Sequence, residues 1–422
     1  MVSRRVVLGS LASALWPSRW LFGQDAGVQM ISVEGEGTRY WPRWRGPSGQ
    51  GVVTGSTYPD TWSATQNVLW KTPIPGRGNS SPIVWHDRVI LTTALDGRRL
   101  SVLAFRRSDG MRLWEALAPE GRNGSTHPKN GHASATPVTD GERVYVSFGG
   151  RGLLAVDLNG AVVWQRDLGA MDAYHGTAGS PLVYRDRIIL YQDQLAGSFV
   201  AAFEARTGRV MWRTNREANV GWGSPVAIRV KDHDEIVVHS QSRVHAYDPD
   251  TGRELWRCSG SNYEVIPTPV VGHGMVFCSS GRAGPTLAIR PGGRGDVTGS
   301  HLVWSSPRGS PFVPSPILYG DYLYMVNDMA SIVTCLEAMT GRTVWQGRLG
   351  AAQREGFSAS PVALDGKLFF TNDDGETFVL RAGPQFELLH VNRIGESTLA
   401  SPALVDGRWY IRTDRNLLAI GG

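Results

Sequence analysis

Cysteine is scarce in this chain of 422 residues, which contains three. Cys258, Cys278 and Cys335 lie far apart and show no C-x-x-C spacing. Closely spaced cysteines are typical of zinc sites, and a high density of cysteine is typical of small disulfide-stapled domains. The sequence therefore argues against both kinds of protein. An odd number also leaves at least one cysteine unpaired in any intramolecular scheme.

Concentrated positive charge is missing as well. The formal net charge of +5 is spread along the chain, and no basic block alternates with aromatic residues. Proteins that bind nucleic acid usually carry such a patch, so we expect no nucleic-acid partner.

The apolar run near the N-terminus, residues 6–16, is too short to span a bilayer. It follows Arg4 and Arg5 and has the proportions of a signal peptide. The segment "SRRVVL" resembles a twin-arginine export signal, although an ordinary secretory signal with two arginines fits equally well. Either interpretation predicts that residues 1–26 direct export. We therefore expect a periplasmic or otherwise extracytoplasmic protein, with no transmembrane span after the signal is removed.

Glycine, proline and tryptophan are abundant, with 51, 24 and 15 copies, and they fall in a repeating frame. "AYDPDTGRELW" at 246–256 recurs as "AFRRSDGMRLW" at 104–114, "AFEARTGRVMW" at 202–212 and "CLEAMTGRTVW" at 335–345. A shorter copy ends at residue 164 and a copy with a longer turn ends at residue 304. We interpret the tryptophan of each copy as a structural wedge that docks between neighbouring units, because one tryptophan buries roughly 150–250 Å². The predicted docking residues are Trp70, Trp114, Trp164, Trp212, Trp256, Trp304 and Trp345, with Leu389 in the same place as the exception.

A second landmark alternates with the first, namely a small residue followed by proline and an apolar run. It occurs at Pro82, Pro137, Pro181, Pro225, Pro269, Pro316, Pro361 and Pro402, at intervals of 41 to 55 residues. Each unit reads as four strands over about 45 residues, the size of a propeller blade. The last unit ends after three strands, and "NVLWKT" at 67–72 supplies the missing one. The sequence thus predicts an all-β, eight-bladed β-propeller over residues 67–422, whose last blade is closed by an N-terminal strand, preceded by a leader at 27–66.

The frame A-x-D-x-x-T-G-x-x-x-W at 246–256 resembles the tryptophan-docking repeat of quinoprotein (PQQ-type) β-propellers. Partial copies extend the resemblance over residues 67–422. "WPRWRGPSGQGV" at 41–52 is similar to the leader of PQQ-like propeller repeat proteins. Two branches of this group bear on function. One is the PQQ-dependent alcohol dehydrogenases, and the other is the propeller lipoprotein that supports outer-membrane β-barrel assembly.

The dehydrogenase branch implies PQQ held over a central calcium ion, with carboxylate ligands, an aspartate base and often a Cys-Cys disulfide. This chain has no Cys-Cys pair. The loops that lead into the innermost strands contain three carboxylates, Glu264, Glu355 and Glu396, all in different blades. Calcium needs six to eight oxygens, so the sequence does not build the implied site. We assign no catalytic or metal-binding residue. A PQQ-dependent or other small-molecule oxidoreductase, with PQQ and calcium as cofactors, stays as the alternative.

The same loops are the predicted binding face, since they bring aromatic and polar side chains to one end of the axis. The predicted binding residues are His132, Tyr174, His175, Trp222, Asn262, Tyr263, Glu264, Phe312, Arg354 and Phe357. The alternative is that these side chains simply fill the pore. We favour an exported, non-catalytic interaction or assembly scaffold in the cell envelope. It is expected to be a monomeric propeller with a protein partner.

Overall fold

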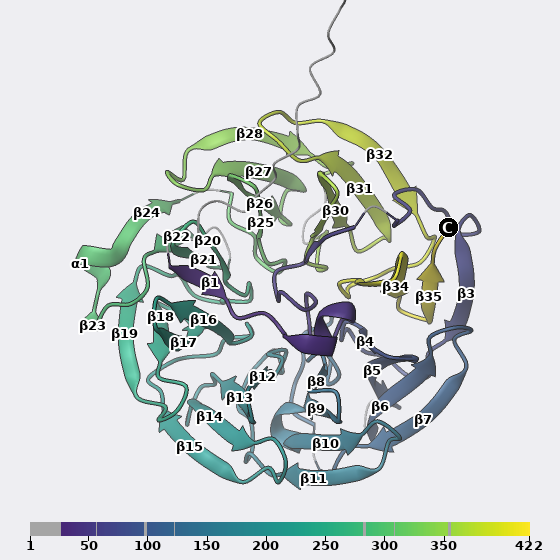
Figure 1. Cartoon of the computed structure of the whole chain (residues 1–422), viewed down its shortest axis with the longest axis horizontal. Coiled ribbons are helices and arrows are strands. Elements are labelled where there is room, and N and C mark those ends of the chain that lie inside the picture. Colours follow the sequence, from purple (N-terminus) through teal and green to yellow (C-terminus); the bar gives the residue numbers. More distant parts are fainter. Residues whose placement is uncertain are drawn as a thin grey trace, which may run out of the picture.

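Eight β-sheets surround a central axis in the computed structural model (Figure 1). The structure describes residues 27–422 except 56, 97, 98, 122, 282, 283, 308 and 353–355. The predicted export signal at 1–26 lies outside the described residues. In each blade the strands run outward from the axis in an antiparallel meander. The predicted eight-bladed propeller is therefore confirmed. Within the described residues, no helix is long and apolar enough to cross a membrane.

The first four blades follow one another along the chain. Blade 1 contains β4 (Ile83–Trp85), β5 (Arg88–Leu95), β6 (Arg99–Arg106) and β7 (Arg112–Leu117). Blade 2 contains β8 (Val138–Thr139), β9 (Arg143–Ser147), β10 (Leu153–Asp157) and β11 (Val162–Arg166), with the 3-10 turn η2 (Gly149–Arg151). Blade 3 contains β12 (Leu182–Tyr184), β13 (Arg187–Gln192), β14 (Phe199–Glu204) and β15 (Val210–Asn215). Blade 4 contains β16 (Val226–Val230), β17 (His233–His239), β18 (Arg243–Tyr247) and β19 (Glu254–Ser259).

The other four blades complete the ring. Blade 5 contains β20 (Val270–Gly272), β21 (Met275–Ser279), β22 (Thr286–Ile289) and β24 (Leu302–Ser306). Blade 6 contains β25 (Ile317–Tyr319), β26 (Tyr322–Asn327), β27 (Ile332–Glu337) and β28 (Thr343–Arg348). Blade 7 contains β29 (Val362–Leu364), β30 (Lys367–Thr371), β31 (Glu376–Arg381) and β32 (Leu388–Arg393). Blade 8 contains β33 (Ala403–Val405), β34 (Arg408–Arg412), β35 (Asn416–Ile420) and β3 (Val68–Pro73).

Blade 8 joins the two ends of the propeller. Strand β3 pairs antiparallel with β35, and Trp70 lies opposite Ala419. The C-terminus ends beside this pair in Figure 1. Pairing the first strand with the last removes the free sheet edge that an open array of blades would leave. The predicted closure by an N-terminal strand is therefore confirmed.

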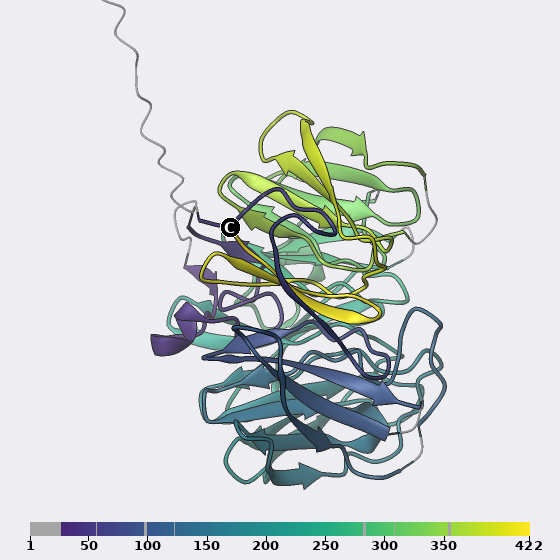
Figure 2. The same cartoon turned by 90° about the vertical axis from the view of Figure 1, so that its right-hand side faces the viewer.

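Residues 28–53 of the leader lie near the ring's centre on one face (Figures 1 and 2). Its strand β1 (Val28–Met30) pairs with the inner strand of blade 4, and β2 (Val52–Val53) pairs with the inner strand of blade 7. Between them follow the 3-10 turn η1 (Gly35–Arg39) and a bridge from Trp41 to Val84 of blade 1. The leader thus provides hydrogen-bond partners for the axis-facing edges of inner strands.

Indole N–H groups hold most blade interfaces together. Six of the seven frame tryptophans donate from Nε1 to a backbone carbonyl in the next blade, over 2.9–3.1 Å. At five of these interfaces the turn glycine of the next blade faces the indole ring of the tryptophan, and its φ lies between 69° and 88°. A Cβ on Gly252, for example, would lie 2.4 Å from the Trp212 ring. Glycine is therefore needed both for the backbone conformation and for the contact.

Trp256 is the exception, because its Nε1 donates instead to the buried carboxylate of Glu235, over 2.8 Å within the same blade. The next blade carries the insertion at residues 291–300. Strand β23 (Gly295–Asp296) of this insertion pairs with β19, and the short helix α1 (Thr298–His301) follows. At this interface Trp256 therefore pairs with Gly295 of the longer turn, and its side chain is fully buried.

The interface that lacks a frame tryptophan receives one from the leader. Trp62 packs against Phe369 of blade 7 and Trp409 of blade 8, with ring centroids 6.3 and 5.0 Å away. Its backbone N–H donates to Asn392 Oδ1 over 3.0 Å. Leu389 packs at the edge of the same hydrophobic cluster. The leader thus supplies a tryptophan at the interface where Leu389 replaces the frame tryptophan.

Candidate functional site

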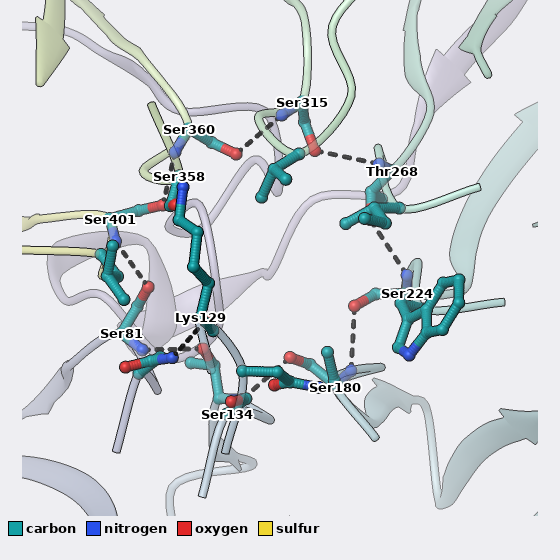
Figure 3. A pocket seen from close by; sticks show the side chains of 18 of the residues that line it. Ser81, Lys129, Ser134, Ser180, Ser224, Thr268, Ser315, Ser358, Ser360 and Ser401 are labelled. Atoms are coloured by element: carbon teal, nitrogen blue, oxygen red, sulfur yellow. Dashed lines mark hydrogen bonds between the residues drawn. The ribbon is translucent and has the colours of Figure 1, made fainter. Parts of the chain in front are cut away.

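A closed ring of hydrogen bonds surrounds the axis where the inner strands begin (Figure 3). In each blade, the backbone N–H of the residue before the landmark proline donates to the hydroxyl of its equivalent in the next blade. All eight bonds measure 2.9–3.0 Å. The members of this hydroxyl ring are Ser81, Thr136, Ser180, Ser224, Thr268, Ser315, Ser360 and Ser401. Small residues were expected at these positions, but their mutual bonding was not predicted.

All eight ring residues line a central cavity of about 190 Å³, which we call the axial cavity. Trp44 of the leader also lines it, with Nε1 3.4 Å from Ser401 Oγ. The loops that lead into the inner strands supply the other walls. The axial cavity is therefore bounded by the leader as well as by the blades.

The insertion at residues 117–131, between blades 1 and 2, also contributes to the axial cavity through His127, Lys129 and Asn130. Asn130 Nδ2 donates to the carbonyl of His175 over 2.7 Å. Lys129 Nζ lies 2.6 Å from Asp373 Oδ2 in blade 7. Figure 3 shows the Lys129 side chain reaching across the cavity toward Ser358. This insertion therefore links separate parts of the ring across the cavity.

Two acidic side chains contact residues that line the axial cavity without lining it themselves. Asp328 is fully buried in the turn between β26 and β27, and its Oδ1 accepts the backbone N–H of Phe312 over 2.8 Å. Its Oδ2 has no hydrogen-bond partner among the residues that the structure describes, and burial raises the pKa of Asp328 to about 6. Asp373 Oδ2 accepts from Ser358 Oγ over 3.2 Å, and burial raises the pKa of Asp373 as well.

Neither aspartate was among the predicted binding residues. Both lie in turns between the two middle strands of a blade, whereas the predicted binding residues lie in the loops before the inner strands. Asp328 follows "YLYMVN" and Asp373 follows "KLFFTN", so the same Asn-Asp pair at the end of a strand is a signal that could have found them.

Four predicted residues line the axial cavity: His175, Trp222, Glu264 and Phe312. The His175 ring stacks on Trp222 at 5.9 Å between centroids, and Trp222 Nε1 donates to the Gly176 carbonyl over 2.8 Å. Glu264 has a left-handed backbone, with φ of 56°. These four therefore come together around one space, from the loops of blades 3 to 6.

The other predicted binding residues lie elsewhere. Tyr174 packs on Trp222 at 5.7 Å between centroids but is exposed, as is Tyr263, which is next to Asn262. His132 lines a separate groove beside Arg151, and its pKa is lowered by burial and by that guanidinium. Phe357 is buried in the hydrophobic core, 6.2 Å from Phe378. Arg354 lies outside the described residues.

Metal-ligating side chains do not gather in the part of the chain that the structure describes. No group of three or more His, Cys, Asp or Glu residues there is arranged to hold an ion. His132 and His175 line different pockets.

Comparison with known sequences gives a family match over most of the chain. A family model described as outer membrane protein assembly factor BamB matches residues 40–194 and 171–347. Outer membrane protein assembly factor BamB of Burkholderia pseudomallei is 29% identical over 201 residues, covering 45% of this chain and 47% of that protein. Tetrathionate hydrolase of Acidithiobacillus ferrooxidans is 22% identical over 232 residues, covering 52% and 44%. The chain thus spans about half the length of these curated relatives.

Solved structures share the fold at low identity. BamB from Moraxella catarrhalis superimposes with a TM-score of 0.59 at 15% identity, covering 83% of this chain and 98% of that one. Quinohemoprotein alcohol dehydrogenase from Comamonas testosteroni gives a TM-score of 0.66 at 12% identity, covering 92% and 81%. At these identities the similarity shows a common propeller fold. Function depends on the residues of the site and not on the fold alone.

Proposed function

This chain belongs to the family described as outer membrane protein assembly factor BamB, and on that premise we propose that it is an exported, non-catalytic scaffold that binds a protein partner in the cell envelope. The observation that carries the proposal is a set of three exposed large side chains on hydrogen-bonded loops near the axial cavity. They are Tyr174, Leu195 and Tyr263, which we call the loop-face patch.

The loop-face patch is built on closely connected loops of blades 3 to 5. The Leu195 backbone N–H donates to the Asp172 carbonyl over 2.9 Å, two residues from Tyr174. Trp222 packs on Tyr174 and donates its backbone N–H to Val265, two residues from Tyr263. The three side chains are 43%, 53% and 51% exposed. Exposed aromatic and leucine side chains held on an ordered base suit protein recognition, where tyrosine often contributes much of the binding energy.

The alternative function, a PQQ-dependent oxidoreductase, needs a site for the quinone and its calcium ion. Glu264 is the one carboxylate, and Lys129 the one lysine or arginine, among the described residues that line the axial cavity. No three of the acidic or histidine side chains described converge as a metal site. A calcium ion needs six to eight oxygen ligands, usually including several carboxylates. The described residues therefore do not fit PQQ with calcium. A tightly bound, stoichiometric quinone chromophore after incubation with PQQ and calcium would overturn this conclusion.

Photo-crosslinking tests the scaffold directly. The full chain, with its own first 26 residues, would carry p-benzoylphenylalanine at position 174 or, as a control, at the exposed Met339 of blade 6. We expect recovery from the periplasm and one prominent crosslinked envelope protein from position 174 but not from 339. The double variant Tyr174→Ser/Tyr263→Ser should lower capture of that protein at least tenfold, because interface aromatics commonly contribute about 2 kcal/mol each. Equal crosslinking from both positions, or none from 174, would contradict the proposal.

A further inference from the structure

Every member of the hydroxyl ring keeps an unused O–H donor. Each of the eight oxygens accepts a backbone N–H from the preceding blade, and none donates to an acceptor within the part of the chain that the structure describes. A hydroxyl has one donor and two lone pairs, so each also keeps a lone pair, except Ser401, whose second is used by Trp44 Nε1. All eight line the axial cavity, and seven of them are more than nine-tenths buried. Their remaining bonds must therefore be made to whatever occupies the cavity.

The formal charges on the cavity lining cancel. Of the lining residues described, Glu264 is the one carboxylate and Lys129 the one lysine or arginine. Most of the other polar groups are hydroxyls and the amides of Asn79 and Asn130. A guest with a net charge would leave water without a matching counter-charge, which is costly in an enclosed site.

The charges behind the lining cancel as well. Asp328 and Asp373 are set against two fully buried guanidinium groups, Arg45 of the leader and Arg412 of blade 8. Arg412 Nη1 donates to the carbonyl and the hydroxyl of Ser80, directly before a ring member, over 3.2 and 2.8 Å. No carboxylate among the residues described pairs with either guanidinium. The site therefore favours neither a cation nor an anion.

The walls beside the hydroxyl ring are aromatic. Trp44, Trp222 and Phe312 line the cavity from the leader, blade 4 and blade 6. Trp222 Nε1 already donates to the Gly176 carbonyl, so this indole offers carbon surface to a guest. The face of an aromatic ring is negative and attracts C–H groups, which carry a partial positive charge. The lining thus combines surfaces for C–H groups with many neutral donors and acceptors.

We infer that the axial cavity binds a neutral, polyhydroxylated guest the size of a monosaccharide, either a free sugar or the terminal residue of a glycan. Guest hydroxyls accept from the ring O–H groups and donate to the free lone pairs. A carboxylate accepts only and an ammonium group donates only, so neither satisfies both sets. The sugar's C–H face packs on the aromatic walls. The site goes beyond the scaffold function and does not depend on it.

The size of the cavity agrees with such a guest. Its volume is about 190 Å³. An apolar cavity of about 150 Å³ holds a benzene molecule, so this one has room for a six-membered ring with substituents.

Calorimetric titration of the purified full-length protein tests the site with defined probes. The methyl α-D-pyranosides of glucose, galactose and mannose differ in the direction of their hydroxyls. We expect a single-site isotherm with at least one of them. It should bind at least tenfold more tightly than methoxycyclohexane, which lacks the ring hydroxyls, and than D-glucuronate, which adds a charge.

Matched variants separate binding from folding. Ser224→Ala removes one ring hydroxyl and should weaken binding of that glycoside roughly fivefold, because one hydrogen bond is lost. Ser300→Ala, in the insertion at 291–300, should leave binding unchanged. Trp44→Ala should weaken binding about tenfold, whereas Trp44→Phe keeps an aromatic face and should retain most of it. Melting curves establish that each variant is folded.

The outcomes also identify the source of the guest. Tighter binding of a trisaccharide that ends in the same sugar assigns the guest to a glycan, and weaker binding assigns it to a free monosaccharide. If none of the three glycosides binds, the ring hydroxyls serve ordered water only and the inference is overturned. Equal binding of methoxycyclohexane, or no change in the Ser224→Ala and Trp44→Ala variants, would overturn it too. Because no cellular partner is used, failure here is distinct from failure of the scaffold proposal.

Discussion

The single buried side chain of Asp328 makes the stability of the whole protein depend on pH. Burial raises the pKa of its carboxyl group to about 6, although the nearby Lys129 acts in the opposite direction. A pKa that is higher in the folded state means that folding favours the protonated form. The stabilising contribution is fully present below the unfolded-state pKa of about 3.9, and it is lost as pH rises through about 6.

Asp328→Asn should therefore stabilise the protein at neutral pH. The amide keeps the acceptor for the Phe312 N–H but carries no charge to bury. A shift of about two units corresponds to roughly 3 kcal/mol, so the variant should gain up to that amount at pH 8 and nothing at pH 4. Urea unfolding of both proteins across this range measures the difference. A constant difference between pH 4 and pH 8 would show that the Asp328 charge is not the cause.

At the scale of elements, the leader has two structural roles that its sequence did not reveal. Residues 28–53 pair with strand edges near the axis, whereas Trp62 fills the interface between blades 7 and 8. Asn392, which accepts the backbone N–H of Trp62, lies 330 residues further along the chain. Such contacts have no local pattern, because the leader occurs once and is not repeated.

Trp62→Ala should destabilise the protein by about 3–5 kcal/mol, the usual loss for a buried tryptophan. The physical reason is the cavity left between Phe369 and Trp409. Leu388→Ala is the matched control, since this side chain is exposed on β32 at the same blade, and it should change stability by less than about 0.5 kcal/mol. Chemical unfolding of the three proteins compares them. If Trp62→Ala behaved like the control, the leader would not be part of the folded core.

At the scale of the whole molecule, the number of blades and the closure were predictable because two landmarks recur in every blade. Proline marks each inner strand and tryptophan marks nearly every outer one, so counting them counts the sheets. The site was less predictable. His175, Trp222, Glu264 and Phe312 were found because they lie in the loops before inner strands, whereas Asp328 and Asp373 come from turns between other strands. Trp256 matches the frame without mismatch yet bonds Glu235, because the longer turn after β22 changes its neighbour.

The hydroxyl ring links all eight blades, so we expect loss of its bonds to lower the free energy of unfolding of the whole propeller, which unfolds as one unit. Ser360→Ala removes the acceptor for the buried N–H of Ser315, and Ser180→Ala does the same for Thr136. Each should cost about 1–2 kcal/mol, because a buried donor is left unpaired. The two sites lie four blades apart and share no partner, so the double variant should lose the sum.

Ser134→Ala is the control for the ring, since Ser134 lines the same cavity and makes a long contact of 3.4 Å outside the ring. It should alter stability by less than about 0.5 kcal/mol. Urea unfolding followed by tryptophan fluorescence measures all four variants. We expect a single transition throughout, because closure makes each blade depend on both neighbours and leaves no free edge from which unfolding of one blade could begin. A second transition in the double variant would show instead that blades unfold separately once ring bonds are lost.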